Sequence, residues 1–98
     1  MQPTHFVYLI YPPRPTFLQD ATPDEKEIMG RHFAYLKELS ERGKLLLAGP
    51  TLDGAFGIGI FKTSDAAEAQ RFADGDPAVV SGLVKPVLHP ARLSFLPE

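Results

Sequence analysis

Residues 24–43, DEKEIMGRHFAYLKELSERG, are predicted to form one long amphipathic helix against which the rest of the chain packs. Ile28, Leu36 and Leu39 recur at helical spacing and mark its apolar side. At about 100° per residue, His32 falls between Ile28 and Leu36, so its ring points inward with them. Because an unpaired polar group buried there costs about 1–3 kcal/mol, His32 needs a hydrogen-bond partner.

Both ends of this helix carry sequence signals. Thr22 is predicted to be the N-cap, Pro23 occupies the first helical position, and Glu25 completes a capping box. Gly43 is predicted to terminate the helix.

The flanking segments predict a β-α-β-β-α-β order in a single domain over residues 1–98. Asp53-Gly54 favours a hairpin, and Pro86 and Pro90 place the last strand at a sheet edge. This order is typical of a ferredoxin-like α+β fold, a four-stranded antiparallel sheet with its helices on one face. The predicted strands are 5–11, 44–52, 55–62 and 84–95, the further helices are 66–74 and 77–82, and 12–21 is a proline-rich loop.

The first three predicted strands are apolar on both faces, although helices are expected to cover only one. In residues 5–11, Phe6, Tyr8 and Ile10 share one face while Val7 and Leu9 share the other. An uncovered apolar sheet face indicates an interface. We therefore expect a homodimer that packs sheet to sheet.

Composition excludes several classes of function. The chain has 98 residues, no cysteine and a formal net charge of −2, so disulfides, thiol chemistry and binding to nucleic acid are not expected. The short apolar run near the N-terminus cannot span a bilayer, and a cytoplasmic location without membrane association is expected. Three widely spaced histidines predict no metal site, and we expect no cofactor.

His32 and Asp76 are the candidate catalytic residues, and each has a structural alternative. His32 is either a general acid/base or a hydrogen-bonded core histidine. Asp76, which starts the segment 77–82, either accepts a proton from the His32 ring and fixes its tautomer or only caps that helix.

Two further segments are candidates for binding a small-molecule ligand. Ala48-Gly49-Pro50 interrupts an apolar strand, so Gly49 and Pro50 either form a bulge or provide a pocket wall where a ligand meets the main chain. Ser81 either lines the same cavity or caps a helix end.

The chain resembles the YciI-like (YCII-related) family over nearly its whole length. The resemblance depends on the order and spacing of several short motifs: Arg31-His32 with Tyr35-Leu36, Leu47-Ala48-Gly49-Pro50, Asp53-Gly54, Asp76-Pro77 ahead of Gly82, and Leu88-His89-Pro90. It implies a dimeric α/β barrel fold and places the family's proposed active-site His-Asp pair on His32 and Asp76. Many members carry an arginine one turn before the histidine, where this chain has Met29.

Two functional hypotheses follow from the residues and the resemblance together. The first is a cofactor-independent lyase or isomerase, similar to the family's dehydrochlorinase, that uses His32 and Asp76 on a small hydroxylated, aromatic or unsaturated substrate. The second is a non-catalytic ligand-binding or dimerising module of the same fold. An open cavity touching both residues would favour the enzyme.

Overall fold

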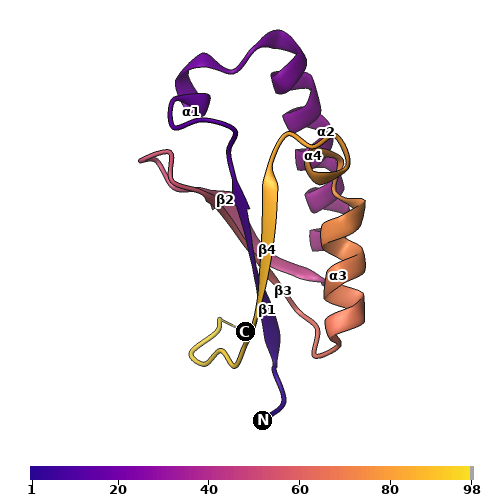
Figure 1. Ribbon diagram of the computed structural model, residues 1–98. Helices are drawn as coiled ribbons and strands as arrows, with labels where there is room; N and C mark the ends of the chain where they lie inside the picture. Colours follow the sequence, from indigo (N-terminus) through magenta and orange to yellow (C-terminus); the bar gives the residue numbers. More distant parts are fainter. Residues whose placement is uncertain (98) are drawn as a thin grey trace.

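The computed structural model describes residues 1–97 and shows an antiparallel sheet with its helices on one face (Figure 1). The sheet order is β2-β3-β1-β4, and all three pairings are antiparallel. The predicted ferredoxin-like α+β fold is confirmed. The elements are β1 (His5–Tyr11), α1 (Phe17–Asp20), α2 (Pro23–Glu41), β2 (Leu45–Pro50), β3 (Gly57–Phe61), α3 (Ala66–Gly75), α4 (Pro77–Val80) and β4 (Lys85–Ala91).

The predicted boundaries hold where a specific capping group sets them. Thr22 caps α2 in a complete capping box with Glu25, and Gly43 follows the helix with a φ of 73°. Asp65 caps α3 by accepting a hydrogen bond from the Ala67 N–H. A side-chain cap depends on neighbouring residues, which explains why the start of α2 was predicted correctly from the sequence.

Two connections differ from the prediction. The segment expected to be a loop contains the short helix α1, whose buried Phe17 anchors it. The β2–β3 hairpin closes over residues 51–56 instead of a two-residue turn, with Thr51 N–H bonded to the Phe56 carbonyl at 2.8 Å. Asp53 accepts from the Thr51 hydroxyl and the Ala55 N–H, so its carboxylate organises a wider turn.

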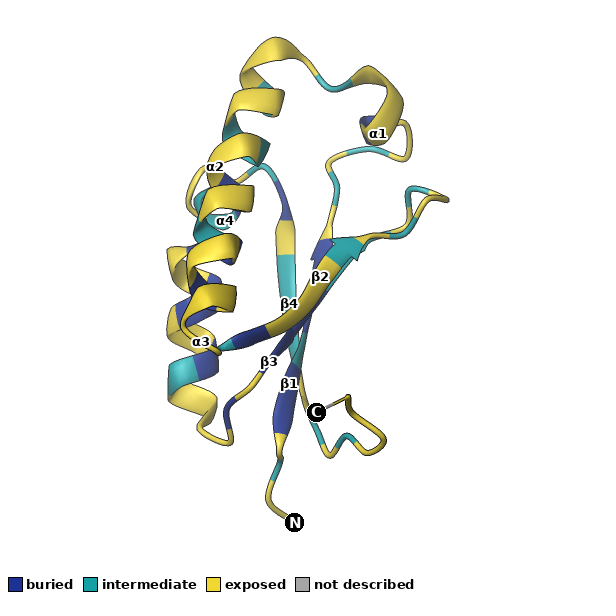
Figure 2. Cartoon of the chain, turned by 180° about the vertical axis from the view of Figure 1, so that it is seen from behind, coloured by how far each residue is buried: buried dark blue, intermediate teal, exposed yellow. Residues whose placement is uncertain are grey.

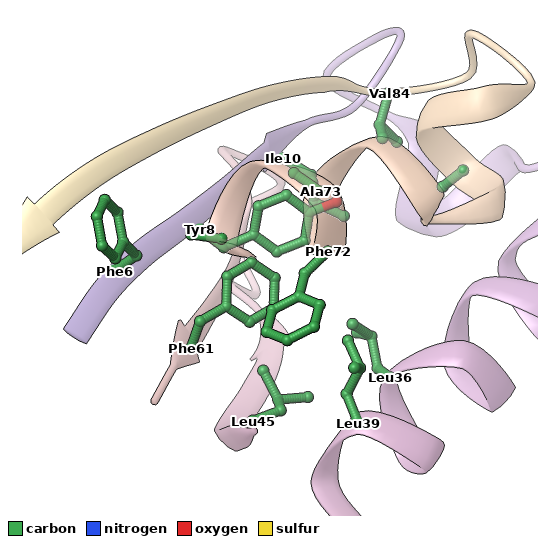
Figure 3. Packing of buried hydrophobic residues seen from close by; sticks show 12 residues of the cluster. Phe6, Tyr8, Ile10, Leu36, Leu39, Leu45, Phe61, Phe72, Ala73 and Val84 are labelled. Carbon is green, nitrogen blue, oxygen red and sulfur yellow. The ribbon is translucent and has the colours of Figure 1, made fainter. Parts of the chain in front are cut away.

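The core lies between the sheet and the helices and is centred on aromatic rings (Figure 3). Phe61 stacks on Tyr8 with centroids 4.9 Å apart and meets Phe72 of α3 edge-on at 5.3 Å. Leu36 and Leu39 of α2 close this cluster. The inward stripe predicted for the long helix is therefore its packing surface.

The opposite sheet face is also apolar. The strand register aligns Leu9 with Ile58 and Val7 with Ile60. Because side chains alternate along a strand, these four residues point away from the helices. Figure 2 shows exposed and half-buried stretches along β2 and β4, which are the two edge strands of this sheet. Among residues 1–97, no helix is long and apolar enough to cross a membrane.

Arg14 holds α1 against the start of α2. Its guanidinium donates to both carboxylate oxygens of Glu25, at 2.7 and 2.9 Å, and to Asp20 at 2.8 Å. The same group lies 5.5 Å from the centre of the Phe17 ring. The hydrogen bonds from Arg14, followed by those within the capping box, lower the pKa of Glu25 from 4.5 to about 2.

This pKa shift predicts a pH dependence of stability. A carboxyl group with a lowered pKa stabilises the folded state above its ordinary value of 4.5, and that contribution is lost as the pH falls toward about 2. We expect Glu25→Gln to lower the melting temperature at neutral pH, and the difference from wild type to shrink below about pH 4.5. Thermal melts followed by circular dichroism between pH 2 and 7 measure both curves.

The control is Glu27→Gln, an exposed position on the same helix that forms none of the four ion pairs of the described residues. A Glu25→Gln difference that does not change with pH would contradict the prediction.

Candidate functional site

His32 and Asp76 come from separate elements and meet in the layer between sheet and helices. His32 lies on the inward side of α2 and is 9% exposed. Asp76 joins α3 to α4 and is completely buried, at 0% exposure. His32 Nδ1 is 2.8 Å from each oxygen of the Asp76 carboxylate, within hydrogen-bond distance.

The Asp76 carboxylate receives three donors. Besides the His32 ring, Tyr8 donates its hydroxyl proton to Oδ2 at 2.7 Å. The Ala78 N–H donates to Oδ1 at 2.9 Å, which caps α4. Asp76 therefore caps α4 and contacts the His32 ring at the same time, so the capping role and the pairing role proposed for it do not exclude each other.

The partners of Asp76 determine which nitrogen of His32 carries the proton. An ionised carboxylate can only accept hydrogen bonds, so Nδ1 is the protonated nitrogen. Among residues 1–97, no hydrogen bond involves Nε2 and no buried side-chain nitrogen or oxygen lacks a partner, so Nε2 is accessible. In neutral His32, this accessible nitrogen therefore has the free lone pair.

Tyr8 belongs to the site although its sequence pattern does not predict it. The pattern places Tyr8 only on one apolar face of the first strand, whereas its hydroxyl reaches Asp76 while its ring stacks on Phe61. Burial, followed by the charge and hydrogen bond of Asp76, raises the pKa of Tyr8 far above its ordinary value of 10. Tyr8 therefore remains a donor across the physiological range. The available signal was a tyrosine on an inward face, where its hydroxyl needs a partner.

Tyr35 positions the end of α3, directly before Asp76. Its hydroxyl donates to the Phe72 carbonyl at 2.7 Å. A Cβ atom on Gly75 would lie 2.8 Å from that hydroxyl, so this position requires glycine unless Tyr35 moves. The contact fixes α3 to α2 and thereby the place where Asp76 enters the core.

A cavity of about 520 Å³ lies between α2 and the β1-β3-β2 part of the sheet. Its volume falls within the range of about 300–1,000 Å³ that is typical of small-molecule sites. Its walls are mainly apolar, and His32 lies in its lining. The lining residues are Tyr8, Ile10, Leu18, Met29, His32, Phe33, Leu36, Lys37, Ser40, Leu45, Leu47, Ala48, Gly49, Pro50, Gly57, Ile58 and Gly59.

Small residues on the sheet create this space. Two rows that line the cavity run across the strands, Tyr8–Gly59–Ala48 and Ile10–Gly57–Pro50. A Cβ atom on Gly57 would lie 2.9 Å from the Ile10 side chain, and one on Gly59 would contact Leu45 at 3.4 Å. Larger residues at these positions would fill the gap between the sheet and α2.

The remaining candidates are placed differently. Gly49 and Pro50 line the cavity together with His32. Of the two alternatives for Ser81, the structure places it at the helix end: its hydroxyl donates to the Ala78 carbonyl and accepts from the Leu83 N–H, and Ser81 is not among the lining residues. Asp76 also lies outside the lining, behind His32. Within the described residues, no three His, Asp or Glu side chains form a metal-binding group.

Tyr8→Phe tests the hydrogen bond to the buried carboxylate. Because a hydrogen bond to a charged group contributes about 1.5–3 kcal/mol, we expect the free energy of unfolding to fall by that amount. Urea denaturation followed by circular dichroism measures the change. Tyr11→Phe is the control, since Tyr11 is 38% exposed and makes no side-chain hydrogen bond to residues 1–97. Equal losses in the two variants would contradict the assignment.

Comparison with known proteins supports the family assignment. The family model for the YCII-related domain matches residues 5–88. No curated protein sequence matches the chain. Among solved structures, the chain is similar to 5-chloro-2-hydroxyhydroquinone dehydrochlorinase (TftG) from Burkholderia phenoliruptrix AC1100 in complex with 2,5-dihydroxybenzoquinone. The TM-score is 0.66 at 22% identity, over 91% of this chain and 95% of that one, so the likeness shows a shared fold. The family match covers most of the chain, and this protein belongs to the YCII-related domain family.

Proposed function

We propose that this protein is a cofactor-independent enzyme, a lyase or isomerase, in which His32 and Asp76 carry out general acid/base chemistry on a small hydroxylated substrate. The observation that carries the proposal is the pairing of Nδ1 with a buried carboxylate at 2.8 Å on a ring that lines a cavity. A base held by a third group in this way is the usual arrangement for activating proton transfer.

In this proposal, Nε2 of His32 removes a proton from the bound substrate. In a lyase reaction, the leaving group departs with its electron pair, so the net change is loss of HX. In an isomerase reaction, the same nitrogen returns the proton to a different atom. Asp76 stabilises the imidazolium formed in either case, and Tyr8 and the Ala78 N–H hold the carboxylate in place.

Cavity shape supports a flat, largely apolar ligand. The floor formed by Gly57, Gly59 and Ala48 carries little side-chain bulk, whereas His32 lies on the opposite wall, on α2. The fold neighbour was solved with 2,5-dihydroxybenzoquinone, a planar hydroxylated ring. We therefore take hydroxylated aromatic and quinonoid compounds as the first substrate class, with Gly49 and Pro50 as ligand contacts.

One observation favours the second candidate, a non-catalytic ligand-binding module. The cavity touches His32 but not Asp76, which is 0% exposed behind the ring. The pair would then be a buried structural contact, and the cavity would bind a ligand without turnover. Because Asp76 acts through His32 in the proposed mechanism, it does not need to reach the substrate, and we retain the enzyme as the primary proposal.

Turnover of 5-chloro-2-hydroxyhydroquinone, followed by chloride release, tests the enzyme directly. We expect His32→Ala to abolish activity and Asp76→Asn to lower kcat, because general acid/base catalysis contributes about 10²–10⁴-fold. His89→Ala, an exposed histidine on β4, is the matched control and should retain wild-type activity. Full activity in His32→Gln, or no chloride release by the wild-type protein, would contradict the proposed reaction.

A second measurement tests the pair without a substrate. Nitrogen-15 NMR of the histidine rings should show neutral His32 with its proton on Nδ1, because the Asp76 carboxylate accepts there. Circular dichroism of His32→Ala and Asp76→Asn shows whether these variants remain folded, which separates loss of the His32–Asp76 contact from unfolding. A neutral His32 that carries its proton on Nε2 would contradict the assigned geometry.

We also propose that the protein is a homodimer that packs through its outer sheet faces. Val7, Leu9, Ile58 and Ile60 form two apolar rows on the face without helices; the first three are half-buried and Ile60 is already buried. Pairing this face with its copy would remove the remaining apolar surface of Val7, Leu9 and Ile58 from water. A two-fold dimer is also the commonest form of homo-oligomer.

Leu9→Glu tests this interface. A carboxylate in the middle of the apolar rows would have to be buried without a partner in the dimer, so we expect the variant to be monomeric. Light scattering at micromolar concentration measures the mass, and Phe33→Glu, an exposed residue on α2, is the control for added charge. A monomeric wild-type protein would contradict the proposal.

A further inference from the structure

The lining of the cavity beside His32 is unevenly charged. Of its seventeen residues, Lys37 is the only one with a permanently charged side chain, and none is acidic. The other polar side chains are the Ser40 hydroxyl, the His32 ring, and the Tyr8 hydroxyl, which is bonded to Asp76. Lys37 therefore supplies the one permanent charge on the cavity wall itself.

Helix geometry places that cation at the mouth. At about 100° per residue, Leu36 lies about 40° and Lys37 about 140° around the helix axis from His32. His32 is buried, whereas Phe33 and Lys37 are exposed. The cavity thus runs along the flank of α2, with the histidine at its inner edge and the lysine at its outer edge.

Lys37 is available for a ligand. None of the ion pairs formed within residues 1–97 includes Lys37. In contrast, Lys44, which lies between α2 and β2, is paired with Glu68 at 3.3 Å. Lys37 is about 7.5 Å from His32 along the helix axis, measured as five residues at 1.5 Å each. A single small molecule can span this separation.

We propose that the site selects an apolar anion: an aromatic body that fills the cavity next to the glycine floor, with a negatively charged substituent held at the mouth by Lys37. This inference rests on the proposed function, because it assumes that the cavity beside His32 is the ligand site. It assigns Lys37 as a specificity-determining residue. Met29 lies on the cavity wall one turn before His32 and contributes only apolar surface there.

A matched pair of fluorescent probes separates charge from apolar contact. 8-Anilino-1-naphthalenesulfonate and N-phenyl-1-naphthylamine share the same aromatic body, and only the first carries a sulfonate. We expect wild-type protein to bind the sulfonate in the cavity, with backbone amide shifts at Gly57 and Gly59 in the NMR spectrum. Its affinity should fall with added NaCl, since salt screens an exposed charge.

Lys37→Met removes the charge but retains an unbranched apolar stem. We expect the Kd of the sulfonate probe to rise about two- to fivefold and its salt dependence to decrease, because an exposed ion pair contributes about this much. The Kd of the neutral probe should not rise. Lys26→Met, an exposed lysine on α2 outside the cavity, should change neither constant.

The outcomes distinguish this inference from the proposed function. The Kd values of the two probes are measured on wild-type protein and Lys37→Met without any substrate, so a failed activity test leaves the charge preference measurable. Equal weakening of both probes by Lys37→Met, an unchanged sulfonate Kd, or a wild-type protein whose Gly57 and Gly59 amides do not respond would overturn the assignment of Lys37.

Discussion

This structure depends on the hydrogen bonds that the buried carboxylate of Asp76 accepts from three separate elements. A charge at 0% exposure is tolerated only when donors surround it, and here they come from β1, α2 and α4 through Tyr8, His32 and the Ala78 N–H. These three elements must therefore pack together in one arrangement. The same bonds orient the His32 ring, so the contact that stabilises the core also fixes the direction of a ring that lines the cavity.

The cavity depends on a different constraint, which is the lack of side-chain bulk on the sheet. Protein interiors are close-packed, so an open space between a helix and a sheet needs small residues on facing positions. Gly57, Gly59 and Ala48 provide them, and a Cβ atom on Gly57 would lie only 2.9 Å from the Ile10 side chain. α2 supplies the other wall and separates its polar groups by depth, with His32 inside and Lys37 outside.

Predictions from the sequence succeeded where a feature is encoded locally. The capping box at Thr22 and the stop at Gly43 follow from neighbouring residues, as does the inward direction of His32. They failed where contacts between separate elements act. The helix α1 is only four residues long and is held by Arg14 bridging to Glu25 of α2. The two alternatives for Ser81 were separated only by the structure, in which its hydroxyl bonds the backbone of its own turn.

The sequence by itself determined the order of elements, two apolar sheet faces, an inward histidine and an acidic cap, because helical and strand periodicity and capping are local. Only the tertiary structure decided that Asp76 lies 2.8 Å from His32, which is 44 positions away, and that Tyr8, 68 positions away, donates to the same carboxylate. Hydrogen-bond distances between separate elements depend on how those elements pack. Periodicity specifies which face a residue occupies, but not what it meets there.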